Sequence, residues 1–162
     1  MKRQEYNEVV ELHSRNLFRF AVNFLRNSGD AEDMVQDVFE KLWKNREKVE
    51  LEKAKSWLFT CMHHAMLNFV KKRSRMDYTT TNELQVGTNA PDTSFESKQV
   101  IDRAVSILPP IQKSIILMRD LEGYSYDEIG DLLNLSPSQV KVYLFRARMK
   151  IKKQLKGSTQ FV

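Results

Sequence analysis

The sequence has few of the residues that support disulfides, tight turns or membrane spans. Cys61 is the only cysteine in 162 residues, so an internal disulfide is impossible, as is typical of a reducing compartment. Glycine and proline are scarce, at 5 and 4 residues, which allows long helices and disfavours a β sandwich. No run approaches the roughly 18 apolar residues of a membrane span, and the N-terminus lacks the apolar core of a signal peptide. We therefore expect a cytoplasmic protein without membrane insertion.

Motifs of catalysis and metal binding are also missing. The sequence contains no glycine-rich phosphate loop, no serine or cysteine nucleophile motif and no HExxH arrangement. Cys61 and His64 lie one helical turn apart and His63 is adjacent, but His13 is the only other histidine. A zinc site normally needs four ligands, or three ligands and a water molecule. We expect no enzymatic activity, no metal and no cofactor.

Helical patterning occupies most of the chain. Apolar residues that recur at steps of three and four predict five helices before the C-terminal segment. Gly29 is expected to end the first helix, and Asp30 is expected to cap the second. The expected helical ranges are 3–26, 31–44, about 52–73, 94–108 and 111–121.

One segment interrupts this pattern. Residues 76–93 are rich in Thr, Asn, Gly, Pro and Asp and lack helical periodicity. A structureless stretch of this length is uncommon inside a compact domain and usually separates domains. With no convincing β alternation, we predict an all-α fold of two small helical domains, 1–75 and 96–162, joined by a flexible linker over 76–95.

The C-terminal segment carries the signals of a helix-turn-helix. Ser125 and Glu128 have the capping-box spacing, and a short helix with inward-pointing apolar residues follows. Asn134 can adopt the left-handed conformation that ends this helix. Ser136 is placed to cap the next helix, with Gln139 reaching back to it. These local signals together predict two helices joined by a tight turn.

The outer face of the last helix is basic. Between residues 137 and 156 there is no Asp or Glu, whereas a surface helix normally mixes both signs. A basic second helix in such a pair is typical of a major-groove reader whose cations face phosphates. The alternative interpretation is a solvated basic helix that ends a bundle. The cations are Lys141, Arg146, Arg148, Lys150, Lys152, Lys153 and Lys156.

At this point the sequence resembles a known family, the sigma-70-type RNA polymerase sigma factors. The segment from Asp30 to Phe39, DAEDMVQDVF, is similar to the helix of that family that docks on RNA polymerase. The short length, with only two domains, is similar to the extracytoplasmic-function (ECF) group. Segments that resemble the family's C-terminal domain are Leu108-Pro109-Pro110, Leu121 through Ile129, and Val140 through Arg148.

The resemblance implies that the C-terminal domain recognises the −35 promoter element. Arg119 stands where the family carries a DNA-contacting arginine, although a surface salt bridge is the alternative. In the last helix, Val142 and Tyr143 replace a small and a basic residue that are usual in the family. The expected −35 contacts are Arg119, Ser138, Gln139, Lys141, Val142, Phe145 and Arg146.

The resemblance implies that the third helix meets the −10 element and assists melting by capturing unpaired bases. His64 stands where the family often has asparagine. Trp57 and Phe59 are also candidates, although burial in the core is the more general expectation for large aromatic residues such as Trp57 and Phe69. The expected −10 contacts are His63, His64, Asn68, Lys71, Lys72, Arg73 and Arg75.

The second helix is expected to bind core RNA polymerase. Its exposed carboxylates could pair with basic residues of the enzyme, and an edge of Phe39 could add apolar area. On the alternative interpretation, the acidic residues of the first turn merely complement the helix dipole. The expected polymerase-binding residues are Asp33, Gln36, Asp37, Phe39 and Glu40.

The implied partners are core RNA polymerase, promoter DNA and an anti-sigma factor. Two other functions fit the pattern of helices less closely. One is a two-domain transcriptional regulator that binds palindromic DNA as a dimer without polymerase. The other is a protein-interaction module whose basic helix is incidental. A pull-down with core polymerase and a mobility shift on DNA alone would separate the three.

Overall fold

The structure is a computed structural model that describes residues 1–77 and 96–159. Those residues are helical with short connections and contain no strand, as the all-α prediction requires. The chain divides into two compact units, Met1–Thr81 and Asn82–Val162. Most of the predicted linker over 76–95 lies outside the described residues. Among the described helices, none carries an apolar stretch sufficient to cross a lipid bilayer.

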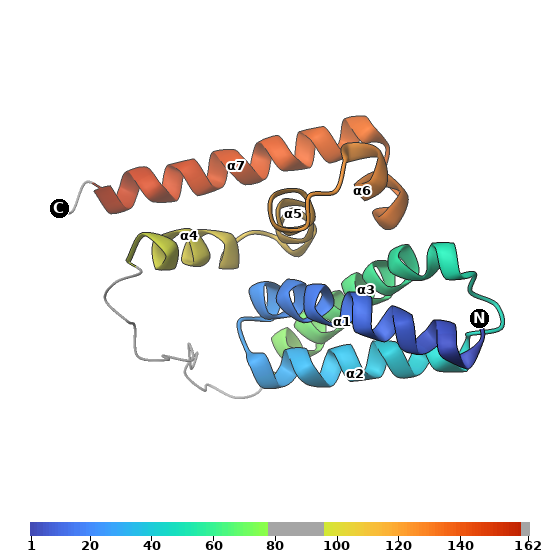
Figure 1. Cartoon of the computed structure of the whole chain (residues 1–162). Helices are drawn as coiled ribbons and strands as arrows, with labels where there is room; N and C mark the ends of the chain where they lie inside the picture. The colour runs from blue at the N-terminus through green and yellow to red at the C-terminus, as the bar shows by residue number, and fades with distance from the viewer. Residues whose placement is uncertain (78–95, 160–162) are drawn as a thin grey trace. The chain divides into compact units, whose positions relative to one another are not determined.

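The first unit is a bundle of three long helices (Figure 1). They are α1 (Arg3–Leu25), α2 (Ser28–Lys44) and α3 (Ala54–Asp77), with the short 3₁₀ turn η1 (Leu51–Lys53) before α3. Each of the three helices packs against the other two. The core is made of large side chains that are less than 2% exposed: Leu17, Phe20, Phe24, Leu42, Leu58, Phe59, Met62 and Met66.

The junction between α1 and α2 differs from the prediction. Arg26, not Gly29, takes the left-handed conformation that ends α1, with φ 60°. Asn27, not Asp30, caps α2, because its side chain accepts a hydrogen bond from the backbone N–H of Asp30 at 2.9 Å. Asp30 instead lies in the first turn, where its charge is favourable beside the helix N-terminus.

The buried face of α3 also differs from the prediction. The sequence pattern placed Trp57 and Phe69 inside, but both are only half-buried. Phe59, a candidate −10 contact, is instead fully buried and stacks in a tilted arrangement on Phe20, with ring centroids 5.6 Å apart. Because α3 packs against both α1 and α2, its buried face is wider than a single stripe at steps of three and four.

The second unit contains shorter helices and one long helix. Its elements are α4 (Glu96–Ser106), α5 (Pro110–Ile116), a π-helical turn η3 (Leu117–Leu121), α6 (Tyr126–Leu133) and α7 (Pro137–Thr159). Helices α4, α5 and α6 all pack against α7, whose buried residues are Val140, Leu144 and Ala147 (Figure 1).

The helix-turn-helix of α6 and α7 has the predicted local structure. Ser125 and Glu128 form a reciprocal capping box, and Asn134 is left-handed with φ 57°. At the start of α7, the Gln139 N–H donates to Ser136 Oγ at 3.2 Å. The Ser136 N–H donates to Gln139 Oε1 at 2.9 Å. These bonds satisfy donors that the helix start would otherwise leave without partners.

Gly130 allows the tight turn between the two helices. A Cβ atom at this position would lie 2.6 Å from the backbone oxygen of Leu135, closer than real Cβ contacts. The Leu135 N–H also donates to the Gly130 carbonyl at 2.9 Å. The close approach of the two backbones therefore requires glycine at residue 130.

Candidate functional site

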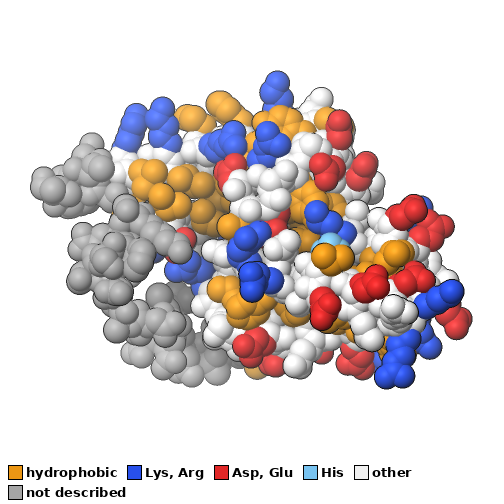
Figure 2. Space-filling model, viewed as in Figure 1, with side chains coloured by type: hydrophobic (Ala, Val, Ile, Leu, Met, Phe, Trp, Pro, Cys, Tyr) orange, Lys and Arg blue, Asp and Glu red, His pale blue; other side chains and the backbone are white. Residues whose placement is uncertain are grey.

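The outer face of α7 is exposed and basic. Figure 2 shows Lys and Arg side chains gathered over this helix, with hydrophobic side chains between them. Two large apolar residues, Val142 and Phe145, are 47% and 66% exposed at the centre of this face. Apolar groups among cations suit a DNA groove, where thymine methyls and phosphates occur together. The candidate residues that the structure brings to this face are Ser138, Gln139, Lys141, Val142, Phe145 and Arg146.

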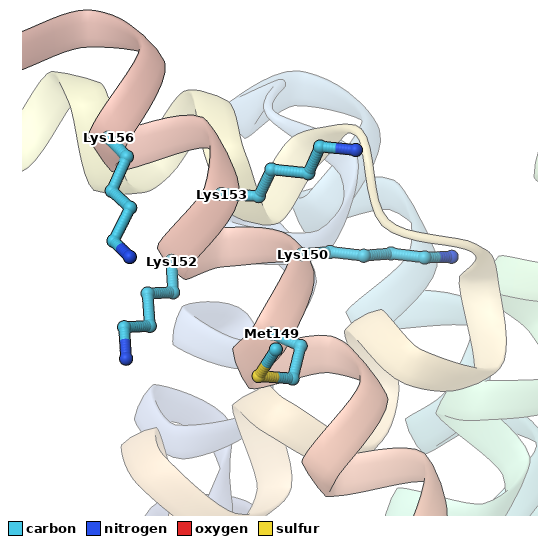
Figure 3. Close-up of a pocket in the computed structure, with 5 residues that line it drawn as sticks. All are labelled: Met149, Lys150, Lys152, Lys153 and Lys156. Atoms are coloured by element: carbon cyan, nitrogen blue, oxygen red, sulfur yellow. The ribbon is translucent and has the colours of Figure 1, made fainter.

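The basic face continues along the second half of α7. A hollow there is lined by Met149, Lys150, Lys152, Lys153 and Lys156 (Figure 3). In this view Lys152 and Lys156 extend to one side of the helix, and Lys150 and Lys153 extend to the other. Met149 is 51% exposed and extends the line of Val142 and Phe145, although the sequence analysis did not single it out.

Arg119 lies in η3, away from α7 in sequence but in the same unit. Its Nη1 donates a hydrogen bond to the carbonyl oxygen of Tyr124 at 2.9 Å. Its guanidinium carbon lies 4.8 Å from the centroid of the Tyr126 ring. The salt bridge in this turn belongs instead to Asp120, whose Oδ1 lies 3.0 Å from Arg148 Nη2 in α7. No sequence motif indicated the contact between Arg119 and Tyr126, so the sequence analysis did not predict it.

The C-terminal half of α3 forms a second basic surface. Arg73 Nη1 lies 3.7 Å from Asp30 Oδ2 at the start of α2, and its guanidinium carbon lies 5.7 Å from the Phe69 ring centroid. The surface therefore contacts a neighbouring helix through an ion pair in which Arg73 is exposed and Asp30 is partly buried. The exposed candidates are His64, Asn68, Lys71, Lys72, Arg73 and Arg75.

His63 does not join this surface. Its side chain is 3% exposed, and its ring centroid lies 5.7 Å from that of His64. Burial lowers the pKa of His63 to about 4, with a smaller contribution from the neighbouring His64. The imidazole is therefore neutral at pH 7 and belongs to the bundle interior, where it cannot contact DNA in this conformation.

The exposed face of α2 is acidic. Asp33, Gln36, Asp37 and Glu40 are all exposed, and Glu40 forms an intrahelical ion pair of 3.1 Å with Lys44. Phe39 differs from these residues because it is only 7% exposed. Its backbone carbonyl accepts a hydrogen bond from the Tyr6 hydroxyl at 2.9 Å. A partner would therefore contact a charged, polar face of α2, with little apolar area from Phe39.

The described residues contain no group of three or more His, Cys, Asp or Glu side chains that could hold a metal ion. Cys61 is half-buried, and burial raises the pKa of its thiol, although Lys41 lowers it to a smaller extent. A raised pKa disfavours the thiolate, which is the form that attacks electrophiles and binds metals.

Comparison with known families gives matches in both units. The model of sigma-70 region 2 matches residues 9–76, and the model of sigma-70 region 4 matches residues 98–151. The first range covers α1 from residue 9 onward, α2 and all but the last residue of α3, and the second runs from the first turn of α4 to Ile151 of α7. The two matches thus include the acidic face of α2, the basic end of α3 and the first part of the basic face of α7.

Individual relatives match over nearly the whole chain. The ECF RNA polymerase sigma factor SigM of Bacillus subtilis is 25% identical over 151 residues, which cover 90% of this chain and 92% of the relative. The RNA polymerase sigma factor YlaC of the same organism is 24% identical, covering 96% and 97% of the two chains.

Two solved structures share the fold. One is the sigma factor RpoE in complex with the anti-sigma factor NepR from Bartonella quintana, with a TM-score of 0.75, 23% identity and coverage of 94% of this chain and 98% of that one. The other is CnrH in complex with the cytosolic domain of CnrY, with a TM-score of 0.73, 20% identity and coverage of 96% and 90%. With both region models matched in order, the chain belongs to the sigma-70 family of RNA polymerase sigma factors, in its extracytoplasmic-function group.

Proposed function

We propose that this chain binds core RNA polymerase and directs transcription initiation at promoters that it selects through a −10 and a −35 element. The observation that carries the proposal is the ordered match of sigma-70 region 2 and region 4. In this assignment residues 1–75 form the polymerase-docking and −10 domain, residues 96–162 form the −35 domain, and residues 76–95 connect them.

The acidic face of α2 is the proposed polymerase-docking surface. Asp33, Asp37 and Glu40 are exposed and lie at steps of three and four, so they share one side of the helix. Exposed charges of this kind set orientation and association rate more than they set affinity. Gln36 adds a side chain beside them that can donate and accept hydrogen bonds, and Phe39 is buried on the inner side of the helix.

The exposed end of α3 is the proposed −10 surface. Its cations, Lys71, Lys72, Arg73 and Arg75, are placed to hold the phosphates of an opened strand. His64 and Asn68 lie one turn apart and offer hydrogen bonds to an unpaired base. Extruding a base costs a few kcal/mol, which contacts in a pocket must offset. His63 is left out of this surface because it is buried.

The face of α7 that begins at Ser138 is the proposed −35 reader. The N-terminal residues of a recognition helix contact base edges, while cations around them hold phosphates. Lys141 and Arg146 are exposed cations, and Val142 and Phe145 are exposed apolar groups that fit thymine methyls. Arg119 supplies a phosphate contact from η3.

The proposal places the protein in the cytoplasm, where it acts as an initiation factor without catalysing a reaction or using a cofactor. One structural neighbour is a sigma factor in complex with an anti-sigma factor. We propose that an anti-sigma partner also regulates this chain, by covering the docking face of α2 or one of the DNA surfaces.

Reconstituted transcription with the cognate core polymerase tests the function. We expect co-purification with core enzyme and defined start sites that depend on upstream −10 and −35 sequences. A chain that does not bind core polymerase in a direct titration, but binds palindromic DNA as a dimer in a mobility-shift assay, would be a regulator instead. A chain that does neither would be an interaction module.

A further inference from the structure

The π-helical turn η3 places two consecutive side chains against different helices of the helix-turn-helix. Asp120 pairs with Arg148 of α7 at 3.0 Å. Arg119 instead lies over the ring of Tyr126, the first residue of α6, and donates to the Tyr124 carbonyl. Single π-helical turns inside helices often occur at functional sites, because they redirect side chains that an α-helix would place elsewhere.

These two contacts fix the orientation of the Arg119 guanidinium. The Tyr124 carbonyl accepts from one of its five N–H donors, and its central carbon lies over the Tyr126 ring. Arg119 is still partly exposed, and it belongs to the same unit as the reader helix. A guanidinium whose plane is already fixed loses less conformational freedom when it binds a phosphate than a freely rotating side chain does.

We propose that Tyr126 is a positioning residue, which holds Arg119 ready to bind a DNA phosphate beside the −35 element. The inference rests on the proposed function and adds to it a residue that does not itself contact DNA. The Arg119 guanidinium contacts the face of the Tyr126 ring. Phenylalanine has the same ring face, so Tyr126→Phe should retain the contact, whereas an aliphatic side chain should lose it.

A double-mutant cycle with the full chain in holoenzyme tests the proposal, using equilibrium binding to promoter DNA with an intact −35 element. We expect Tyr126→Leu to weaken binding by about threefold to tenfold, within the range of cation–π contacts, and Tyr126→Phe to stay within about twofold of wild type. Arg119→Ala should weaken binding at least as much as Tyr126→Leu. In the Arg119→Ala background, Tyr126→Leu should cause no further loss.

The salt dependence of binding separates positioning from a general loss of structure. Arg119→Ala should lower the slope of log K against log salt by about one, because one phosphate contact is lost. Arg119→Lys keeps the charge but lacks the planar fork of donors, so it should bind less tightly than wild type while it keeps the wild-type salt dependence. This variant leaves Tyr126 and the start of α6 unchanged, which makes it informative even if Tyr126→Leu fails to fold.

Three results would overturn the positioning role. Equal losses from Tyr126→Leu with and without Arg119 would mean that the tyrosine contacts DNA itself or only supports the fold. A loss in Tyr126→Phe as large as in Tyr126→Leu would assign the effect to the hydroxyl. Full binding by Tyr126→Leu would remove the role altogether. Wild-type holoenzyme that binds no promoter DNA would instead overturn the proposed function, and the inference with it.

Discussion

The two units of this protein hold their helices in place by different means. The first unit relies on large buried side chains shared by three long helices, as the pairing of Phe20 with Phe59 illustrates. The second unit also has a core, in which Ile115, Met118, Ile129 and Leu144 are less than 2% exposed, but its helix-turn-helix adds local backbone devices: the capping box at Ser125, the left-handed Asn134 and the close approach at Gly130. Single backbone changes should therefore be most damaging in the helix-turn-helix.

The proposed binding surfaces of the two units also differ, in whether they combine charged with apolar side chains. The face of α7 combines cations with exposed Val142 and Phe145, whereas none of the large apolar side chains exposed in the described residues lies on α2. A surface that mixes apolar groups with cations can discriminate between DNA sequences. A purely polar surface mainly orients its partner.

The largest expected effect is on the α7 surface. Lys141→Ala combined with Arg146→Ala should weaken promoter binding by about 2–4 kcal/mol, since each base or phosphate contact contributes about 1–3 kcal/mol. Run-off transcription from a −35-dependent promoter measures the loss. Lys48→Ala with Lys53→Ala removes two exposed charges from the first unit and serves as the control. Full activity of the α7 variant would contradict the assignment of this helix.

Gly130→Ala tests the local backbone device. The added Cβ would meet the Leu135 oxygen at 2.6 Å, so we expect a loss of about 2 kcal/mol or more in the unfolding free energy. Gly157→Ala is the matched control, because nothing lies within 4 Å of its Cβ and alanine favours a helix. Chemical denaturation followed by circular dichroism measures both. Equal stability of the two variants would refute the requirement for glycine.

His63 tests the packing of the first unit through pH. Because burial lowers its folded pKa to about 4, the imidazole must stay neutral, and stability is lost as pH falls below the unfolded value. The fold should lose about 2 kcal/mol from this group between pH 7 and pH 5. Urea denaturation of His63→Gln should show a correspondingly flatter pH dependence over this interval. His64→Gln, on the exposed neighbour, should change the slope less, because His64 makes only the smaller contribution to the lowered pKa of His63.

The smallest expected effect is on the α2 surface. Asp37→Lys should weaken core polymerase binding by about 1 kcal/mol and make it less sensitive to salt, because an exposed charge mainly steers association. Titration of labelled polymerase at two salt concentrations provides the measurement. Glu47→Lys makes the same charge change at an exposed position outside α2. If both variants bind like wild type, the docking assignment fails.

The contrast between the units also explains how much the sequence could predict. Capping boxes and left-handed asparagines are local signals, so the structure of the turn around Asn134 was predicted correctly. The burial of His63 and Phe59 depends on how α3 contacts two other helices, and no local pattern reports this. The π-helical turn at Leu117–Leu121 was not predicted either, because the apolar pattern there indicated an ordinary helix over 111–121.

The ends of α1 and α2 show a related limit. Gly29 and Asp30 have the residue types preferred for ending and starting a helix, but Arg26 and Asn27 take those roles. Neighbouring residues compete for the same capping position, and small energy differences between them decide the outcome. The sites themselves were predicted mainly through resemblance, because exposed residues such as Asp37 leave little trace in periodicity.

The length of α7 has a consequence for how the protein finds its target. At 1.5 Å per residue, its 23 residues span about 35 Å, whereas the major groove is about 12 Å wide. If α7 reads the −35 element as proposed, we expect the lysines of its second half to lie beyond the base edges and to meet only the sugar-phosphate backbone, which every genomic site presents alike. Phosphate contacts of this kind support one-dimensional sliding of the protein along DNA of any sequence. The time for which the protein stays bound to such DNA should shorten steeply as intracellular ionic strength rises.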